Sequence, residues 1–134
     1  MSRTVGIGVK LLWASPWTLL GLAAGLIAIA TGGTGRRVGR VLEFQGGWLP
    51  WFLRWVPIAG GASAMTLGHC VLACSAGALV RTRQHERVHV AQYERWGVLF
   101  VPAYLAASAW LWCRGRDPYR DNPFEVEAFA RESQ

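Results

Sequence analysis

The stretch His85-Glu86-Arg87-Val88-His89 decides the expected architecture, because it places two histidines four residues apart. On a helix, residues four apart lie one turn apart on the same face, so both imidazoles reach one point in space. Imidazole nitrogen is a common zinc ligand, and a catalytic zinc site keeps a position open for water. Glu86 lies about 100° around the helix from His85, where a carboxylate is placed to take a proton from that water. We therefore expect a metal-binding helix; the alternative is an exposed helix with solvated histidines.

The motif helix is expected to run from about Arg81 to Trp96 and to end at Gly97. At 100° per residue, Glu94 falls on the side opposite His85 and shares that side with Arg87. Both are therefore expected to be ordinary surface charges. The further residues expected on the metal face are Gln92, Tyr93 and Trp96.

Two histidines do not complete a catalytic zinc site, so a third protein ligand is expected. A short C-terminal helix is predicted, with Asn122 as its N-cap before a proline. Glu125 emerges from an apolar arc of this helix, where a carboxylate needs a partner, whereas Glu127 can pair with Arg131 four residues on. We expect Glu125 to be the ligand. The alternatives are that Glu127 binds the metal, or that Glu125 only completes a capping box with Asn122.

The composition indicates a membrane-associated protein of a single domain. The chain has 134 residues, of which 52% are hydrophobic and only 16% charged, and it contains eight tryptophans. Its net charge of +6 comes almost wholly from arginines, several of which flank apolar stretches. Anionic lipid headgroups explain this pattern better than nucleic acid, because no nucleic-acid-binding motif accompanies it. Cys70 and Cys74 lie near His69, but they fit small apolar residues of a strand better than a second metal site.

Residues 11–31 form a charge-free apolar run of twenty-one residues, long enough to cross a hydrocarbon core of about 30 Å. We expect a retained membrane anchor followed by a hinge at residues 32–35. A cleaved signal peptide stays open as an alternative, because residues 28–30 resemble a cleavage site. The arginines that follow the run predict a cytoplasmic location for the rest of the chain.

A second apolar run, residues 97–113, is predicted not to cross the membrane. If it crossed once, Glu125 would lie on the opposite side of the bilayer from His85 and His89, and the three could not share an ion. We expect this run to fold back against the motif helix. Tyr104 and Ser108 share one of its faces and are expected to face protein.

The two motifs together resemble a known family pattern. H-E-x-x-H followed by Phe124-Glu125-x-Glu127-Ala128 is similar to gluzincin zinc metallopeptidases, in particular to membrane peptidases of the CAAX prenyl protease and HtpX type and to small bacterial membrane proteins with the same motifs. In that family the second motif is glutamate, two variable residues, alanine and aspartate; here Phe129 stands in place of the aspartate. The resemblance implies zinc as the cofactor and an edge strand before the motif helix that pairs with substrate. The resemblance implies that His85, His89 and Glu125 are the zinc ligands and that Glu86 is the base.

We therefore expect an α+β fold with a minimal zincin-like core, a short antiparallel β-hairpin packed against the motif helix and the C-terminal ligand helix. Residues 1–35 would form an N-terminal transmembrane anchor and hinge, and residues 36–134 the metal-binding domain, with strands near residues 38–45 and 63–74. The expected activity is zinc-dependent hydrolysis of a peptide or protein substrate. Possible donors to the oxyanion are Tyr93, Tyr119 and His69. The alternative is a membrane-anchored zinc-binding or scaffold protein without turnover, which Phe129 and the short chain favour.

Overall fold

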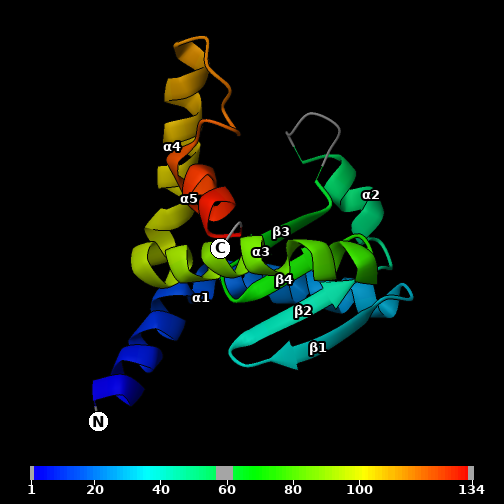
Figure 1. The fold of residues 1–134 in the computed structure, drawn as a ribbon. Coiled ribbons are helices and arrows are strands. Elements are labelled where there is room, and N and C mark those ends of the chain that lie inside the picture. Colours follow the sequence, from blue (N-terminus) through cyan, green and yellow to red (C-terminus); the bar gives the residue numbers. More distant parts are fainter. Residues whose placement is uncertain (1, 57–61, 133–134) are drawn as a thin grey trace.

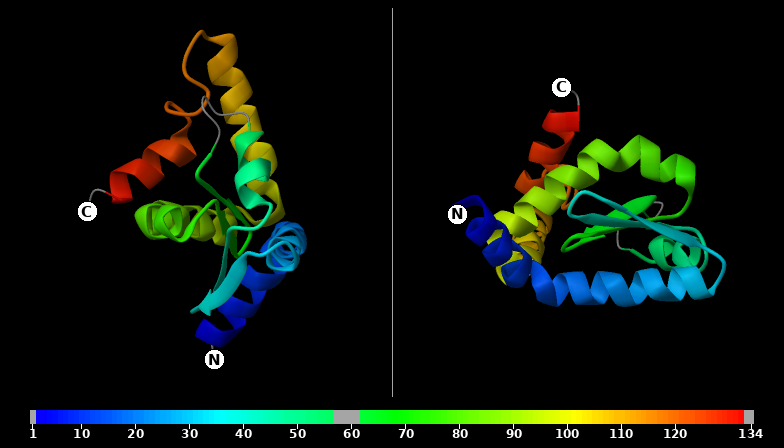
Figure 2. Two further views of the ribbon diagram at one scale, coloured as in Figure 1. Left: turned by 90° about the vertical axis from the view of Figure 1, so that its right-hand side faces the viewer. Right: turned by 90° about the horizontal axis from the view of Figure 1, so that it is seen from below.

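A computed structural model describes residues 2–56 and 62–132, in which a small sheet lies between two long helices (Figure 1). In chain order the elements are α1 (Ser2–Ala30), β1 (Thr34–Val38), β2 (Val41–Gln45), α2 (Leu49–Arg54), β3 (Ala64–Leu67), β4 (Cys70–Ala73), α3 (Ala76–Trp96), the 3-10 helix η1 (Gly97–Leu99), α4 (Phe100–Cys113) and α5 (Pro123–Glu132). Helix α1 covers one face of the sheet and α3 covers the other (Figure 2). The fold is therefore α+β, as expected.

The sheet has four strands in the order β1-β2-β4-β3, so the expectation of a single short hairpin is wrong. The pairs β1–β2 and β3–β4 are antiparallel, and β2 pairs with β4 in parallel. The segments expected as single strands, residues 38–45 and 63–74, each include a two-residue turn of a hairpin, between β1 and β2 and between β3 and β4. The turns begin at Gly39 and Gly68, whose φ angles of +62° and +61° are readily adopted only by glycine.

The core has two layers because β4 is buried on both faces, with all four of its residues inaccessible to solvent. Cys70 and Leu72 belong to the cluster on the α1 side, and Val71 and Ala73 to the cluster on the α3 side. This alternation is what a strand with helices on both faces requires. Cys70 is fully buried among apolar side chains, so it packs as a small apolar residue.

Helix α1 packs against the sheet through glycines that allow close approach. A Cβ added at Gly25 would lie 2.5 Å from the Phe44 ring, and one at Gly21 would lie 2.7 Å from the Cys70 Cβ. The boundary expected at residue 35 falls inside β1, and Gly33, expected in a hinge, packs tightly against the backbone oxygen of Gln45. Helix α1 is therefore a layer of the folded domain.

Two helical segments are long and apolar enough to cross a membrane, Leu12–Ala30 and Ala76–Cys113. The second segment is not one straight helix. Helix α3 begins at Ala76, earlier than expected, because Ser75 caps it by accepting a hydrogen bond from the Ala78 N–H, and it ends where expected, before Gly97 with φ +58°. Helix α4 then leaves at a steep angle (Figure 1). Its fourteen residues extend about 21 Å, less than a hydrocarbon core of about 30 Å.

The packing of α1 on the sheet leads to a stability prediction. Gly25→Ala forces α1 away from Phe44, and we expect it to lower the free energy of unfolding by about 1–3 kcal/mol. Gly8→Ala is the matched control, because nothing lies within 4 Å of a Cβ there; it is expected to be neutral or to stabilise by up to about 1 kcal/mol. Thermal unfolding followed by circular dichroism measures both. Equal stability of the two variants would contradict the packing of α1 on the sheet.

Candidate metal centre

Helix α3 buries all three chemical groups of the H-E-x-x-H motif. His85, Glu86 and His89 are exposed by only 6%, 5% and 7%. The alternative of an exposed helix with solvated histidines is therefore wrong. Because the two histidines are four residues apart, their rings lie on one face of α3, with centroids 5.0 Å apart.

Helix α5 brings Glu125 to this pair of imidazoles. The same carboxylate oxygen, Oε1, lies 2.9 Å from His85 Nε2 and 3.2 Å from His89 Nε2. Glu125 is 4% exposed, and one ligand atom from each of the three residues lies within 4.8 Å of the others. The structure thus unites the three residues predicted as ligands, and this buried group could hold a metal ion. No other set of three such ligands occurs among residues 2–56 and 62–132.

The geometry and charge of the group fit a divalent cation. With bonds of about 2.0 Å, ligand atoms in a tetrahedral site lie about 3.3 Å apart, so the two separations between Glu125 Oε1 and the histidine nitrogens need to open by only a few tenths of an ångström. Glu86 and Glu125 carry two negative charges when ionised, and metal-ligating imidazoles are neutral. A dication balances those charges inside the protein, where unbalanced charge is costly.

Neighbouring side chains hold the ligands in the orientation that a metal needs. The Nδ1–H of His89 donates to Gln92 Oε1 at 2.8 Å, so Nε2 is the ring nitrogen that points toward Glu125 and that a metal would bind once it has lost its proton. The Tyr104 hydroxyl donates to Glu125 Oε2 at 2.6 Å, so that Oε1 is the carboxylate oxygen turned toward the histidines. The sequence placed Gln92 on the metal face and Tyr104 on a protein-facing surface, but it did not identify their partners.

Asn122 fixes the start of α5 against α4. Its Oδ1 accepts from the Phe124 N–H at 3.0 Å, which confirms the predicted N-cap. Its Nδ2 donates to Ser108 Oγ at 2.8 Å and to the Tyr104 backbone oxygen at 3.1 Å. The contact of Tyr104 and Ser108 with protein is therefore confirmed. Glu125 is turned toward the histidines and is not limited to a capping box.

Glu127, the other carboxylate considered as a ligand, clamps α5 to α3. It accepts from Gln92 Nε2 at 2.7 Å and from Arg95 at 2.9 Å, and it pairs with Arg131 at 3.7 Å. Gln92 Nε2 also donates to the Phe124 backbone oxygen at 2.9 Å. One glutamine therefore orients His89 with its carbonyl and holds α5 with its amide.

The charges of the group are strongly coupled. Burial alone would raise the pKa of Glu125, but hydrogen bonds from His85 and His89 outweigh it and hold that pKa at about 2. Burial alone would lower the pKa of His89, but the bond to Glu125 and the nearby Glu86 raise it to about 9. The pKa of His85 is raised in the same way. A metal ion binding here must therefore displace protons from the histidines.

Glu86, the predicted base, lies beside the ligand group and touches the edge strand β3. Burial raises the pKa of its carboxyl, and His89 and the Thr66 hydroxyl offset part of this effect. Thr66 Oγ1 donates to Glu86 Oε2 at 2.5 Å. Nothing in the sequence marks Thr66, because its partner lies twenty residues away and on another element.

The structure separates the three predicted oxyanion donors. The Tyr93 hydroxyl donates to the Thr66 backbone oxygen at 3.1 Å, and the tyrosine is only 2% exposed. His69 Nε2 lies 2.8 Å from Glu94, on the side of α3 opposite His85. His69 is therefore not part of the group formed by His85, His89 and Glu125, which we call the metal group. Tyr119 is half-buried, and its ring lies 5.9 Å from that of Phe129.

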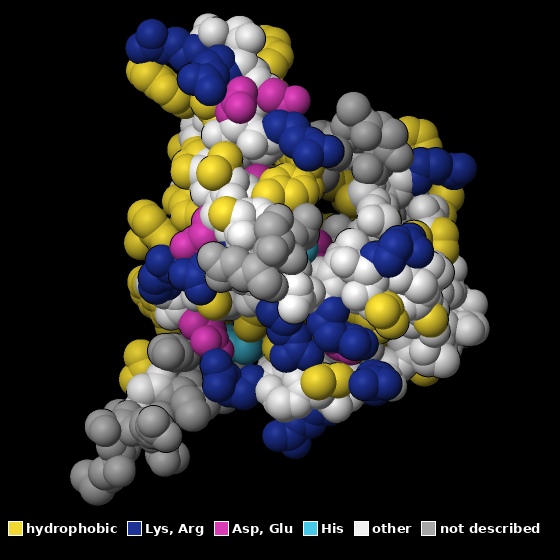
Figure 3. Space-filling view, viewed as in Figure 1, with side chains coloured by type: hydrophobic (Ala, Val, Ile, Leu, Met, Phe, Trp, Pro, Cys, Tyr) yellow, Lys and Arg dark blue, Asp and Glu magenta, His cyan; other side chains and the backbone are white. Residues whose placement is uncertain are grey.

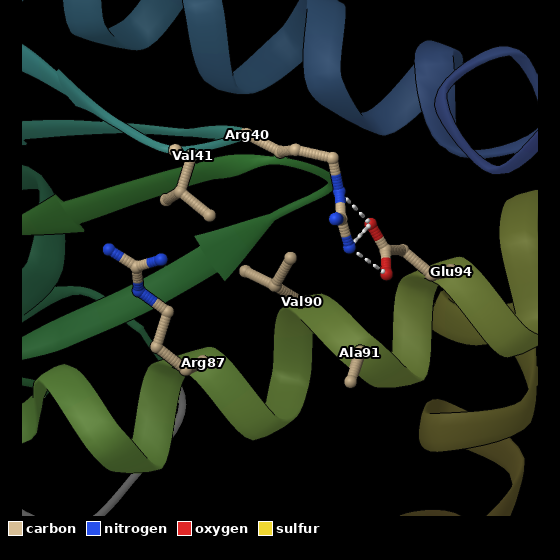
Figure 4. A pocket seen from close by; sticks show the side chains of 7 residues that line it. Arg40, Val41, Arg87, Val90, Ala91 and Glu94 are labelled. Atoms are coloured by element: carbon tan, nitrogen blue, oxygen red, sulfur yellow. Dashed lines mark hydrogen bonds and ion pairs between the residues drawn. The ribbon is translucent and has the colours of Figure 1, made fainter. Parts of the chain in front are cut away.

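Glu94 and Arg87 are not the ordinary surface charges that the helical wheel predicts. The Glu94 side chain is only 8% exposed and accepts three hydrogen bonds from Arg40, as Figure 4 shows beside a pocket between the β1–β2 hairpin and α3. Arg87, with Arg83, donates to the buried carboxylate of Glu43. These ion pairs fasten α3 to the sheet, on the side away from the metal group.

No family model, curated protein or solved structure matches this chain. The fold and site themselves define an α+β protein with a buried group of two histidines and one glutamate that could hold a metal ion. The resemblance to gluzincin peptidases rests on the two sequence motifs.

The assignment of ligands leads to a prediction on metal retention. Removing a partner of a metal ligand typically weakens binding 10- to 100-fold, so loss of a ligand itself should cost more. We expect Glu125→Gln to weaken zinc binding by more than about 100-fold and Glu127→Gln, the same chemical change two residues on, by less than about tenfold. Zinc competition with a chromophoric chelator measures both. The reverse order would show that Glu127 is the ligand.

Proposed function

We propose that this protein is a membrane-associated, zinc-dependent peptidase that acts at the cytoplasmic surface of the membrane. The observation that carries the proposal is the meeting of His85, His89 and Glu125 around one point, with Glu86 buried next to it. Two imidazoles and one carboxylate are a ligand set of catalytic zinc sites, which leave the fourth position for water or substrate. The carboxylate of Glu86, which is not a ligand, is then available for proton transfer.

The residues have distinct roles in the proposed hydrolysis. His85, His89 and Glu125 would hold zinc, which would polarise a substrate carbonyl and acidify water. Glu86 accepts the proton of the attacking water and later passes it to the leaving amine. Tyr104 and Gln92 keep Glu125 and His89 in position through their hydrogen bonds. Of the predicted oxyanion donors, Tyr119 is the one we retain, because its ring packs on Phe129, which itself packs on His85.

The substrate in this proposal is an extended peptide or protein segment. Strand β3 is at one edge of the sheet, so its outer backbone groups can pair with another strand. Thr66 joins that strand directly to Glu86. A peptide added along β3 would therefore run close to the proposed base.

A second candidate function is zinc binding without turnover, in a membrane-bound scaffold. The specific observation in its favour is Phe129, which occupies the position of the aspartate in the second motif. Its ring lies 4.5 Å from that of His85, edge to face. A carboxylate there would raise the basicity of a ligand, which a phenyl ring cannot do.

Glu86→Gln distinguishes the two functions. It removes the base but no ligand, so zinc content should equal that of wild type while hydrolysis falls by about 10²–10⁴-fold. Asp121→Asn, the same kind of change at a loop carboxylate, serves as the control and should keep both. The assay is mass spectrometry of a peptide mixture from a digested bacterial proteome.

Full activity in Glu86→Gln would eliminate Glu86 as the base. Zinc-loaded wild-type protein that cleaves no peptide of the mixture would favour the scaffold function.

A further inference from the structure

The exposed apolar side chains are concentrated on one set of helices. Among the described residues, all but three of the exposed large apolar side chains belong to α1, η1, α4 or to α2 and the residue after it; the exceptions are Val80, Trp96 and Val126. In both views of Figure 2, α1, α2 and α4 lie toward one side of the molecule, and α3 and α5 toward the other. The molecule thus has one apolar side.

On α1 this exposure has a helical period. Leu12, Leu19 and Leu26, spaced seven residues apart and so on one face, are 75%, 64% and 56% exposed. The opposite face carries small residues that lie against the sheet, including Gly21 and Gly25. One face of α1 is therefore covered by protein along much of its apolar run. The opposite face, which carries Leu12, Leu19 and Leu26, is exposed, and we call it the bare face.

An upright α1 would carry the sheet into the bilayer. Strands β2 and β4 pack against the same part of α1 that would lie in the hydrocarbon core. The neighbouring edge strand β1 would follow, with exposed Arg36 and Arg37 and with an open backbone edge. Hydrocarbon does not tolerate open sheet edges, and arginine there is costly.

We propose that the protein is monotopic: α1 lies in the plane of the membrane, with its bare face immersed in the acyl chains of one leaflet of an anionic bilayer. This differs from the spanning anchor that the sequence alone predicts. Exposed tryptophans belong to this apolar surface, with Trp13 on α1, Trp51 and Trp55 at α2, and Trp110 and Trp112 on α4, and the amphipathic indole ring suits the headgroup layer.

The charges next to the apolar surface favour an anionic bilayer as the partner. Exposed arginines border the apolar helices, with Arg54 at the end of α2 beside Trp55 and Arg114 at the end of α4 over Trp110. The net charge of the chain is +6, and no acidic residue lies in α1, α2 or α4. Arginines beside an immersed apolar face attract the phosphates of anionic lipids. On the face that carries α3, Figure 3 shows Lys and Arg side chains beside several groups of apolar side chains, so basic residues are not confined to the apolar side.

The placement directs the metal group away from the lipid. His85, His89 and Glu125 lie between α3 and α5, on the side opposite the bare face of α1. The group would therefore face the aqueous phase and water-soluble protein segments. The membrane placement itself does not depend on whether the group is catalytic.

Spin-label depth at the three heptad positions tests the placement. Single cysteines replace Leu12, Leu19 or Leu26 in a full-length chain from which Cys74 and Cys113 have been removed, while buried Cys70 is kept. The labelled protein is reconstituted in phosphatidylcholine vesicles with about one-quarter phosphatidylglycerol. Val80→Cys is the control, because it is an exposed apolar position on α3.

In-plane binding predicts equal depths for the three labels, about 5–10 Å below the phosphates, and a Val80→Cys label in water. A Leu19→Cys label near the bilayer centre, with shallower labels on either side, would overturn the proposal in favour of a spanning helix. Three labels fully accessible to a water-soluble relaxation agent would also overturn it. Leu20→Cys and Ile27→Cys, again seven residues apart and exposed, replace any variant whose circular dichroism differs from that of wild type.

Discussion

The contact on which the rest of the structure depends is one carboxylate oxygen, Glu125 Oε1, shared by two imidazoles of α3. The histidines are local to each other, but Glu125 is forty residues from His85. The intervening chain must therefore leave α3, turn and return. Gly97 starts this excursion, and Asn122 ends it by capping α5 and binding α4. The excursion leaves four ionisable groups buried together, a state that only protons or a cation can balance.

The second constraint is the position of the sheet between α1 and α3. Strand β4 is buried on both faces, so neither helix can be removed without exposing apolar residues such as Leu72 and Val71. Glycines on α1 bring it close to the sheet, and ion pairs with Glu43 and Glu94 hold α3 on the other side. An apolar helix built into the domain in this way has only its outer face to offer a membrane. The metal group and the apolar face thus lie on opposite sides of one small scaffold.

Local patterns in the sequence were sufficient to predict the motif helix, its end at Gly97, the Asn122 N-cap and the meeting of Glu125 with the histidines. Each follows from helical periodicity, capping chemistry or the cost of a buried carboxylate. The four-stranded sheet was missed because two-residue glycine turns divide segments that look like single strands. The bonds of Thr66 and Tyr104 join distant elements and follow no local pattern. Hydropathy predicted the apolar helix α1 but not its packing on the sheet, because hydropathy records apolar character and not which face of a helix is covered by protein.

The central claim is that His85, His89 and Glu125 together hold a zinc ion. X-ray absorption at the zinc edge of the purified, zinc-loaded protein tests it most directly, because it identifies the ligand atoms themselves. The account predicts a shell of nitrogen and oxygen at about 2.0–2.1 Å with the outer scattering of two imidazoles, and no sulfur. A sulfur shell at about 2.3 Å, as from Cys70 or Cys74, or a shell without imidazole scattering would contradict it.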